Sequence, residues 1–292
     1  MKDNRATVCG RNMVSDSRHV SAEHLKNSAE ILKKAKELGA DLAGWVSIDE
    51  LKNSPSCQFA PQMPYRRDEH ASGAHRMSRE LNLKHGEVSW PEGMESVLVI
   101  AVSHPEDQPR MDFWEGKRSP SGNRILMSII KQLCAWIEQR YSYETFHLPY
   151  QVGTGGIYLK DAAALAGLGC IGANNLLVTP EFGPRVRLRA LAVNVRMVST
   201  GPTSFDPCAV CDKPCLERCP QKALGTAIYE SDDFQGLQNL PGRTGHYNVA
   251  YCDREMTRAK ETATEEFVED LEENRTIVKY CRNCEFTCPV GR

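Results

Sequence analysis

Apolar residues recur along the chain at spacings that change from one segment to the next. Between Ser21 and Leu38 an apolar residue appears every three or four positions, which is typical of an amphipathic helix, and Gly39 follows where that helix should end. Apolar and polar residues then alternate from Asp41 to Ile48, as in a strand with one buried face. The pattern predicts a helix followed by a strand.

Further segments continue this alternation of helix and strand. The apolar run from Ser96 to Val102 predicts a fully buried strand, and one apolar face predicts a helix from Gly122 to Tyr141. An Ala-rich helix near Lys160 leads into three glycines, a turn and an alternating strand that ends near Val195. The Pro-rich stretch 55–65 is expected to be a loop. Together these segments indicate an α/β fold.

Eight of the twelve cysteines lie in the segment 208–292. The order along the chain is Cys208-x2-Cys211-x3-Cys215-x3-Cys219-Pro220, then Cys252, then Cys281-x2-Cys284-x3-Cys288-Pro289. Two-cluster ferredoxins carry the run C-x2-C-x2-C-x3-C-P, whose last cysteine ligates the other cluster. Applying this crossover to both Cys-Pro pairs predicts one [4Fe–4S] cluster on Cys208, Cys211, Cys215 and Cys288, and a second on Cys219, Cys252, Cys281 and Cys284.

Two other interpretations of these cysteines compete with iron–sulfur clusters. The chain has one extra residue between Cys211 and Cys215, and Cys252 lies far upstream of Cys281 and Cys284, although loops tolerate such insertions. Zinc ribbons pair C-x2-C with C-x2-C and make no use of a Cys-Pro ending. A disulfide framework needs a secretory route, and no signal for one is visible. The spacing therefore favours two clusters.

Charge and hydropathy restrict the classes of partner. The net charge of −2 and the pI near 6.5 leave no excess of positive charge to neutralise a phosphate backbone, so we expect no nucleic acid. Residues 1–20 are polar and are expected to form a loose arm, and no run approaches the roughly 18 apolar residues of a membrane span. We expect a cytoplasmic protein without a membrane partner.

Two histidines are candidates for chemistry. His70 lies in a D-x-H-x-x-G pattern by which some cobalamin proteins supply a cobalt ligand, but prolines and arginines precede it instead of a buried strand. A solvated loop histidine is therefore expected at His70. His104 follows the buried strand 96–102, where ligand pockets of α/β sheets tend to form, and a plain loop histidine is the alternative.

Three glycines within six residues, Gly167, Gly169 and Gly172, interrupt the chain after the Ala-rich helix. Glycine lets a backbone approach a flat ligand closely and leaves N–H groups free to bind it. The same pattern also fits a glycine-capped helix followed by a hairpin, because a glycine cluster alone is a weak motif.

Taken together, the glycine segment and the cysteine motifs resemble the corrinoid-dependent iron–sulfur reductases, which comprise epoxyqueuosine reductase and the reductive dehalogenases. The resemblance runs from about Ala29 to Pro289. It implies a nitroreductase-like α/β sheet domain over residues 21–198, a ferredoxin-like domain with two [4Fe–4S] clusters over 199–292, and a cobalamin whose cobalt has no protein histidine. It also implies that the corrin is lined by Gly167, Leu168, Gly169, Ile171, Gly172, Asn174, Leu177, Thr179, Pro180, Phe182, Gly183, Arg185 and Arg187.

Some positions depart from that family. Epoxyqueuosine reductases have a proton-donating aspartate where this chain has Gly153, and the sequence ends soon after the last cysteine motif, without the helical-repeat region that helps such enzymes hold transfer RNA. Epoxyqueuosine reduction is therefore not expected. Respiratory dehalogenases carry a twin-arginine signal, which is absent here, and use a tyrosine as proton donor. Tyr158 is the nearest candidate and His104 the second, with a packing tyrosine as the alternative for Tyr158.

The resulting hypothesis is a cobalamin-dependent iron–sulfur oxidoreductase. An external low-potential donor, ferredoxin or flavodoxin, would pass single electrons through the clusters to cobalamin, which would reduce a small substrate such as an organohalide. One alternative is an electron-transfer or activator protein that reduces the corrinoid of a partner protein and has no substrate of its own. Another is a flavin in place of the corrinoid in the sheet domain.

Overall fold

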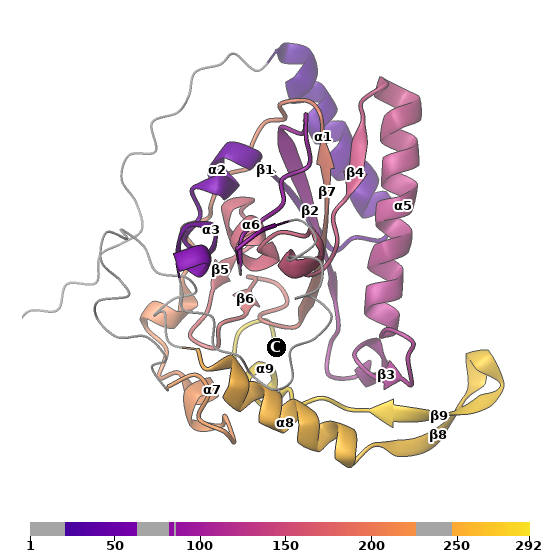
Figure 1. Ribbon diagram of the computed structural model, residues 1–292, viewed down its shortest axis with the longest axis vertical. Coiled ribbons are helices and arrows are strands. Elements are labelled where there is room, and N and C mark those ends of the chain that lie inside the picture. The colour runs from indigo at the N-terminus through magenta and orange to yellow at the C-terminus, as the bar shows by residue number, and fades with distance from the viewer. Residues whose placement is uncertain (1–20, 63–81, 85, 226–246) are drawn as a thin grey trace, which may run out of the picture.

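The computed structural model describes residues 21–62, 82–84, 86–225 and 247–292, and His70, expected to be a solvated loop histidine, lies outside them. A four-stranded sheet forms its centre, in the order β1-β2-β7-β4 (Figure 1). The strands are β1 (Leu42–Ser47), β2 (Ser96–Ser103), β7 (Val186–Val193) and β4 (Thr145–His147). Every neighbouring pair is antiparallel, with β2 and β7 in register from Ser96↔Val193 to Ser103↔Val186.

Helices cover both faces of this sheet. On one face lie α1 (Ala22–Glu37) and α5 (Ser121–Tyr141), and on the other α6 (Leu159–Leu165) and α2 (Ile48–Lys52). The side chains of β2 alternate between the two cores, so that Leu98 and Ile100 face α1 and α5 while Val97 and Val99 face α6. This double cover explains why β2 is an unbroken apolar run although its neighbours are antiparallel.

The first helices follow their sequence signals closely. The side chain of Ser21 caps α1 by accepting a hydrogen bond from the backbone N–H of His24 (3.1 Å). The expectation of a loop over 55–65 is wrong in its first part, because α3 (Pro55–Phe59) and a 3₁₀ turn (Ala60–Gln62) form there. Ser54 caps α3 and Pro55 occupies its first turn, where a missing N–H costs nothing.

The glycine segment forms a small hairpin beside α6. The strands β5 (Cys170–Ile171) and β6 (Leu177–Val178) pair antiparallel, and a five-residue loop from Gly172 to Leu176 joins them. Gly167 directly follows the C-cap of α6 with φ +76°, a conformation that glycine adopts without strain. The predicted sequence of helix, glycines, turn and strand is confirmed.

The cysteine-rich segment consists of short elements below the sheet (Figure 1). They are a 3₁₀ turn (Pro207–Ala209), α7 (Pro214–Glu217), α8 (Val249–Glu261), β8 (Thr264–Val268), a second 3₁₀ turn (Glu269–Leu271), β9 (Glu273–Val278) and α9 (Asn283–Phe286). A second sheet, in the order β3-β9-β8, includes β3 (Trp114–Glu115) from the earlier part of the chain. The boundary expected near residue 198 is thus crossed by strand pairing. No helix in the described ranges is both long and apolar enough to span a bilayer.

Candidate functional site

The first set of cysteines comes together where three separate segments meet. Cys208 lies in the 3₁₀ turn, Cys215 in α7, and Cys288 just after α9. The pKa of Cys215 is raised to about 11, chiefly by burial and then by the nearby thiols of Cys208, Cys288 and Cys211, because neighbouring thiolates repel a further negative charge.

The second set gathers around α9 in the same way. Burial raises the pKa of Cys284, and Glu285, Cys281, Cys252 and Cys219 raise it further. Burial is also the main cause of the raised pKa of Cys281, and Cys252 and Cys219, which are distant in the sequence, contribute to it. The structure therefore brings together the two sets of four that the crossover rule names, while their binding of iron stays a prediction.

Backbone N–H groups point at several of these sulfur atoms. Ala173 donates to Sγ of Cys208 (3.4 Å), Lys213 to Sγ of Cys211 (3.3 Å) and Ala223 to Sγ of Cys219 (3.3 Å). Such donors stabilise a thiolate, and hydrogen bonds to sulfur help to set the potential of an iron–sulfur cluster.

The spacing of the thiols bears on what they can hold. Over the ranges that the structure describes, no three His, Cys, Asp or Glu side chains converge closely enough to bind a single metal ion. A zinc site needs four sulfurs at about 2.3 Å from one point, whereas a four-iron cluster is itself larger and keeps its thiolates further apart. The cysteine spacing along the chain therefore remains the argument for two clusters.

The glycines of the predicted corrin segment are required by contacts within the protein. A Cβ atom at Gly169 would lie 2.1 Å from the carbonyl oxygen of Val178, and one at Gly167 would lie 2.3 Å from that of Gly201. These contacts account for glycine at both positions, and binding of a corrin by this segment stays a prediction. The close approach is real, but its partner is the neighbouring chain segment.

The turn after Gly172 faces the cysteines. Asn174 donates its side-chain amide to the carbonyl oxygen of Cys284 (3.4 Å), and Ala173 binds Cys208 as described above. A Cβ atom at Gly172 would be 3.6 Å from Sγ of Cys208. Buried members of the predicted corrin segment are Leu168, Gly169, Gly172, Asn174, Leu177, Thr179, Gly183 and Arg185, and partly exposed or exposed members are Gly167, Ile171, Pro180, Phe182 and Arg187.

The two arginines of this segment are engaged elsewhere. Arg185 donates to the backbone oxygen of Glu285 (3.0 Å). Arg187 forms an ion pair with Asp112 and donates to Oδ1 of Asn123 (3.1 Å). Both guanidinium groups thus bind other residues of the chain. A role for either arginine in binding the corrin stays a prediction.

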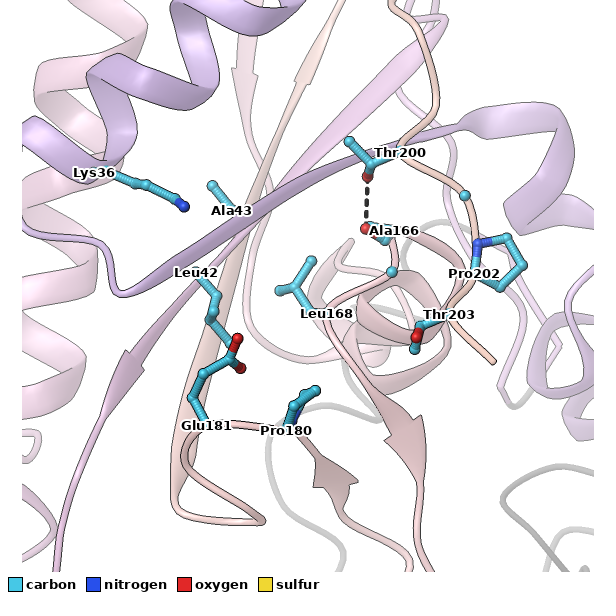
Figure 2. Close-up of a pocket in the computed structure, with 12 residues that line it drawn as sticks. Lys36, Leu42, Ala43, Ala166, Leu168, Pro180, Glu181, Thr200, Pro202 and Thr203 are labelled. Carbon is cyan, nitrogen blue, oxygen red and sulfur yellow. Dashed lines mark hydrogen bonds between the residues drawn. The ribbon is translucent and has the colours of Figure 1, made fainter. Parts of the chain in front are cut away.

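A surface pocket of about 270 Å³ is lined by the start of the glycine segment and by the chain around Thr200 (Figure 2). Thr200 closes one side by donating its hydroxyl to the carbonyl oxygen of Ala166 (2.6 Å). Pockets for drug-sized ligands measure about 300–1,000 Å³, and a corrin is much larger than such a ligand. This pocket alone is smaller than a corrin requires. Its lining includes three members of the predicted corrin segment, Gly167, Leu168 and Pro180.

His104 is buried at the end of β2, with 3% of its surface exposed. Its ring contacts the guanidinium of Arg282, which also donates to the His104 carbonyl oxygen (3.0 Å). Burial, reinforced by Arg282 and Arg187, lowers the pKa of His104 to about 3. With this pKa the His104 ring is neutral at physiological pH, and a neutral imidazole is a poor acid. The structure therefore disfavours His104 as a proton donor.

The pH dependence of stability tests this assignment of His104. Its folded pKa lies below the unfolded value of 6.5, so its contribution to stability is complete above pH 6.5 and is lost as the pH falls toward 3. Between pH 7 and pH 5 the free energy of unfolding should fall by about 2 kcal/mol more in the wild type than in His104→Gln. Urea unfolding at both pH values measures this difference. Equal pH slopes in the two proteins would contradict the burial argument, and His147→Gln on exposed β4 is the control.

Tyr158 is the N-cap residue of α6, and its hydroxyl donates to the carbonyl oxygen of Gly86 (2.7 Å). The side chain is half-buried in the core on the α6 face. This geometry suits a packing tyrosine with one polar end, and the proton-donor role of Tyr158 stays a prediction.

Two features escaped the sequence argument. One is a charge cluster around His104 that consists of Arg282, Asp112 and Glu285. Nε of Arg282 lies 2.7 Å from Oε2 of Glu285 and 3.4 Å from Oδ2 of Asp112. Lys160 is also enclosed: it donates to the carbonyl oxygen of Asn175 (2.6 Å), and burial lowers its pKa to about 8. The only sequence signal was charge within otherwise apolar or cysteine-rich stretches, which is weak.

Comparison with known proteins finds one kind of protein similar in sequence and two kinds similar in fold. No family model matches it. It is 24% identical over 274 residues to an epoxyqueuosine reductase of Lactococcus garvieae, covering 90% of this chain and 69% of the relative. An epoxyqueuosine reductase in complex with an epoxyqueuosine-modified tRNA-Tyr stem loop has a TM-score of 0.57 at 20% identity, covering 91% of this chain and 65% of that one. A reductive dehalogenase whose structure suggests a mechanism for B12-dependent dehalogenation has a TM-score of 0.57 at 16% identity. The match covers 95% of this chain and 34% of that one.

The RNA complex corrects one expectation. Charge balance led us to expect no nucleic acid, yet a protein of the same fold binds an RNA stem loop. A net charge of −2 averages over the whole chain and does not exclude a local binding surface. The exclusion of nucleic acid was therefore too strong.

Sequence similarity over most of the chain and the shared fold agree with the motif order of glycine segment and split cysteine runs. The chain is similar in sequence to epoxyqueuosine reductases over most of its length and shares the fold of epoxyqueuosine reductases and reductive dehalogenases.

Proposed function

We propose that this protein is a corrinoid-dependent iron–sulfur reductase that carries two [4Fe–4S] clusters. The observation that carries the proposal is the packing of two sets of four cysteines against the Gly172–Asn174 turn, with Ala173 on the first set and Asn174 on the second. Electrons that arrive on either cluster would thus be held next to the sheet domain. The named relatives are reductases, which supports the same conclusion.

The two parts of the chain would divide the work. Residues 21–198 would hold the corrinoid and residues 199–292 the clusters. The pairing of β3 with β9 and the ion pairs around Arg282 would keep these parts in a fixed relation, which electron transfer needs. The bound cobalamin would supply a low-valent cobalt as nucleophile and reductant, and the protein would supply orientation and electrostatics.

The reduced substrate needs a proton as well as electrons. Gly153 occupies a 3₁₀ turn (Val152–Thr154) and has no side chain to donate one. Tyr158 is the proposed donor, and it would act after its hydroxyl exchanges the Gly86 carbonyl for the substrate. A small organic substrate, halogenated compounds included, is the leading candidate because it needs no extended binding surface.

Epoxyqueuosine in transfer RNA is the second candidate substrate. The structural neighbour in complex with a modified stem loop favours it, and the chain spans 65% of that neighbour and 69% of the Lactococcus relative. Reduced ferredoxin or flavodoxin is the proposed electron donor for either substrate. The comparisons do not favour an activator protein without substrate or a flavin in the sheet domain.

Turnover assays under anaerobic conditions separate these substrates. The holoprotein, supplied with a low-potential chemical reductant, should reduce members of an organohalide panel, and Tyr158→Phe should lower that rate by about 10²–10⁴-fold because a positioned general acid is lost. Tyr143→Phe is the matched control, since Tyr143 is also half-buried and holds one hydrogen bond, from Asn27 (2.7 Å).

The outcomes point to different substrates. Turnover of a modified RNA stem loop, with none on organohalides, would replace the small substrate by the RNA. Organohalide turnover that is equal in the wild type and Tyr158→Phe would remove Tyr158 from the mechanism. Reduction of a partner corrinoid protein alone would return the function to the activator class.

A further inference from the structure

Arg185 is a buried arginine whose side chain reaches the end of the cysteine-rich segment. It precedes β7 directly and has 4% of its surface exposed. Its guanidinium donates to the carbonyl oxygens of Glu285 (3.0 Å), Cys288 (3.5 Å) and Val290. One side chain of the sheet domain therefore binds three backbone positions on both sides of a predicted cluster ligand.

The chemistry of these contacts favours an arginine over any other residue. The carbonyl groups lie at the end of α9 (Glu285) and in the chain that follows it (Cys288 and Val290), where no regular helix pairs them. A guanidinium carries five N–H donors in a rigid fork, so it can bind several such oxygens at once, whereas an amide or an ammonium group binds them less completely.

A second contact, next to the Arg185 guanidinium, holds the same segment. A Cβ atom at Gly291 would lie 2.2 Å from the backbone nitrogen of Gly183, and one at Gly183 would lie 2.0 Å from the carbonyl oxygen of Val290. Both glycines have positive φ, +69° and +57°. The turn at Gly183 is closed by hydrogen bonds between the backbones of Thr179 and Gly183 (2.8 and 3.0 Å).

Cys288 is among the residues that Arg185 contacts and lies three residues before Gly291. The helix α9 carries Cys284, and Cys281 precedes it, but Cys288 neighbours Cys208 and Cys215 of the other set. The short segment must therefore turn away from one cluster and toward the other within four residues of Cys284.

We propose that Arg185 is a positioning residue that orients Cys288 toward the cluster of Cys208, Cys211 and Cys215. This inference rests on the proposed function, because it takes these cysteines to hold an iron–sulfur cluster. It assigns Arg185 to the cluster ligand instead of the corrin surface on which the sequence had placed it.

Iron analysis and electron paramagnetic resonance of anaerobically reconstituted protein test the proposal. Arg185→Gln should retain about four of about eight irons, with the signal of the Cys281 and Cys284 cluster kept. Arg185→Lys keeps the charge without the fork and should lose less. Gly291→Ala, which leaves Arg185 intact but forces the tail away from Gly183, should cause the same selective loss.

The matched control is Arg189→Gln, which removes an equally charged, half-buried arginine of β7 whose guanidinium lies over the ring of Tyr150 (4.9 Å). It should retain both clusters. Two intact clusters in Arg185→Gln, or equal loss of both, would overturn the proposal. A wild-type protein without iron would instead refute the proposed function, so the two failures are distinguishable.

Discussion

Replacing Cys288 with alanine is expected to remove the cluster of Cys208, Cys211 and Cys215 and to spare the cluster of its sequence neighbours Cys281 and Cys284. Burial, and then the proximity of Cys208 and Cys211, raises the pKa of Cys288, which places its thiol beside the first set. A cluster that loses one of four thiolates is held poorly, so the iron content should fall from about eight to about four per chain.

Matched spectra make this experiment decisive. The residual paramagnetic signal of Cys288→Ala should equal that of Cys208→Ala, and the residual signal of Cys219→Ala should equal that of Cys281→Ala. Cys134→Ala, which removes a buried cysteine of α5 outside both sets, should keep both signals. A Cys288→Ala spectrum that matches Cys281→Ala would show that the ligands are not crossed.

Replacing Arg282 with glutamine should destabilise the folded protein by about 3–5 kcal/mol, because breaking a buried ion pair leaves uncompensated charge. Arg282 is 6% exposed and lies 2.7 Å from Glu285 and 3.4 Å from Asp112. Asp112 keeps Arg187 as a partner, so Glu285 should bear most of the loss. The midpoint of urea unfolding measures the change.

The sign of the pH dependence gives a second measure for Arg282→Gln. Burial raises the pKa of Glu285 above its ordinary value, and Arg282 opposes that rise. Without Arg282 the pKa of Glu285 in the folded protein rises further. A raised pKa in the folded state means that stability is lost as the pH increases through that pKa. The loss of unfolding free energy in Arg282→Gln should therefore be larger at pH 7 than at pH 5. Arg275→Gln, whose ion pair with Glu273 is exposed, should cost less than about 1 kcal/mol. A similar small loss in Arg282→Gln would contradict the account.

Periodicity predicted the elements that bury a face. The helices α1 and α5 and the strands β1, β2 and β7 all appear where apolar spacing placed them. The short helix α3 escaped because Pro55 was interpreted as a loop signal, although a proline after Ser54 also favours the first turn of a helix. The antiparallel order could not be inferred from β2 alone, since a strand covered on both faces is apolar in either type of sheet.

The sequence likewise predicted some parts of the candidate site and missed others. Cysteine spacing carries ligand chemistry directly, so the two sets could be named before the fold was known. A glycine signals only that something approaches closely, and at Gly169 this is the carbonyl of Val178. The contact between His104 and Arg282 joins residues 178 positions apart, and no local pattern encodes such a pair.

Metal and cofactor analysis of the anaerobically purified protein tests the central claim most directly. We expect about eight iron ions and one cobalt per chain, together with the visible absorption of iron–sulfur clusters and of a corrinoid. Stoichiometric zinc with little iron, or bound flavin without cobalt, would contradict the account.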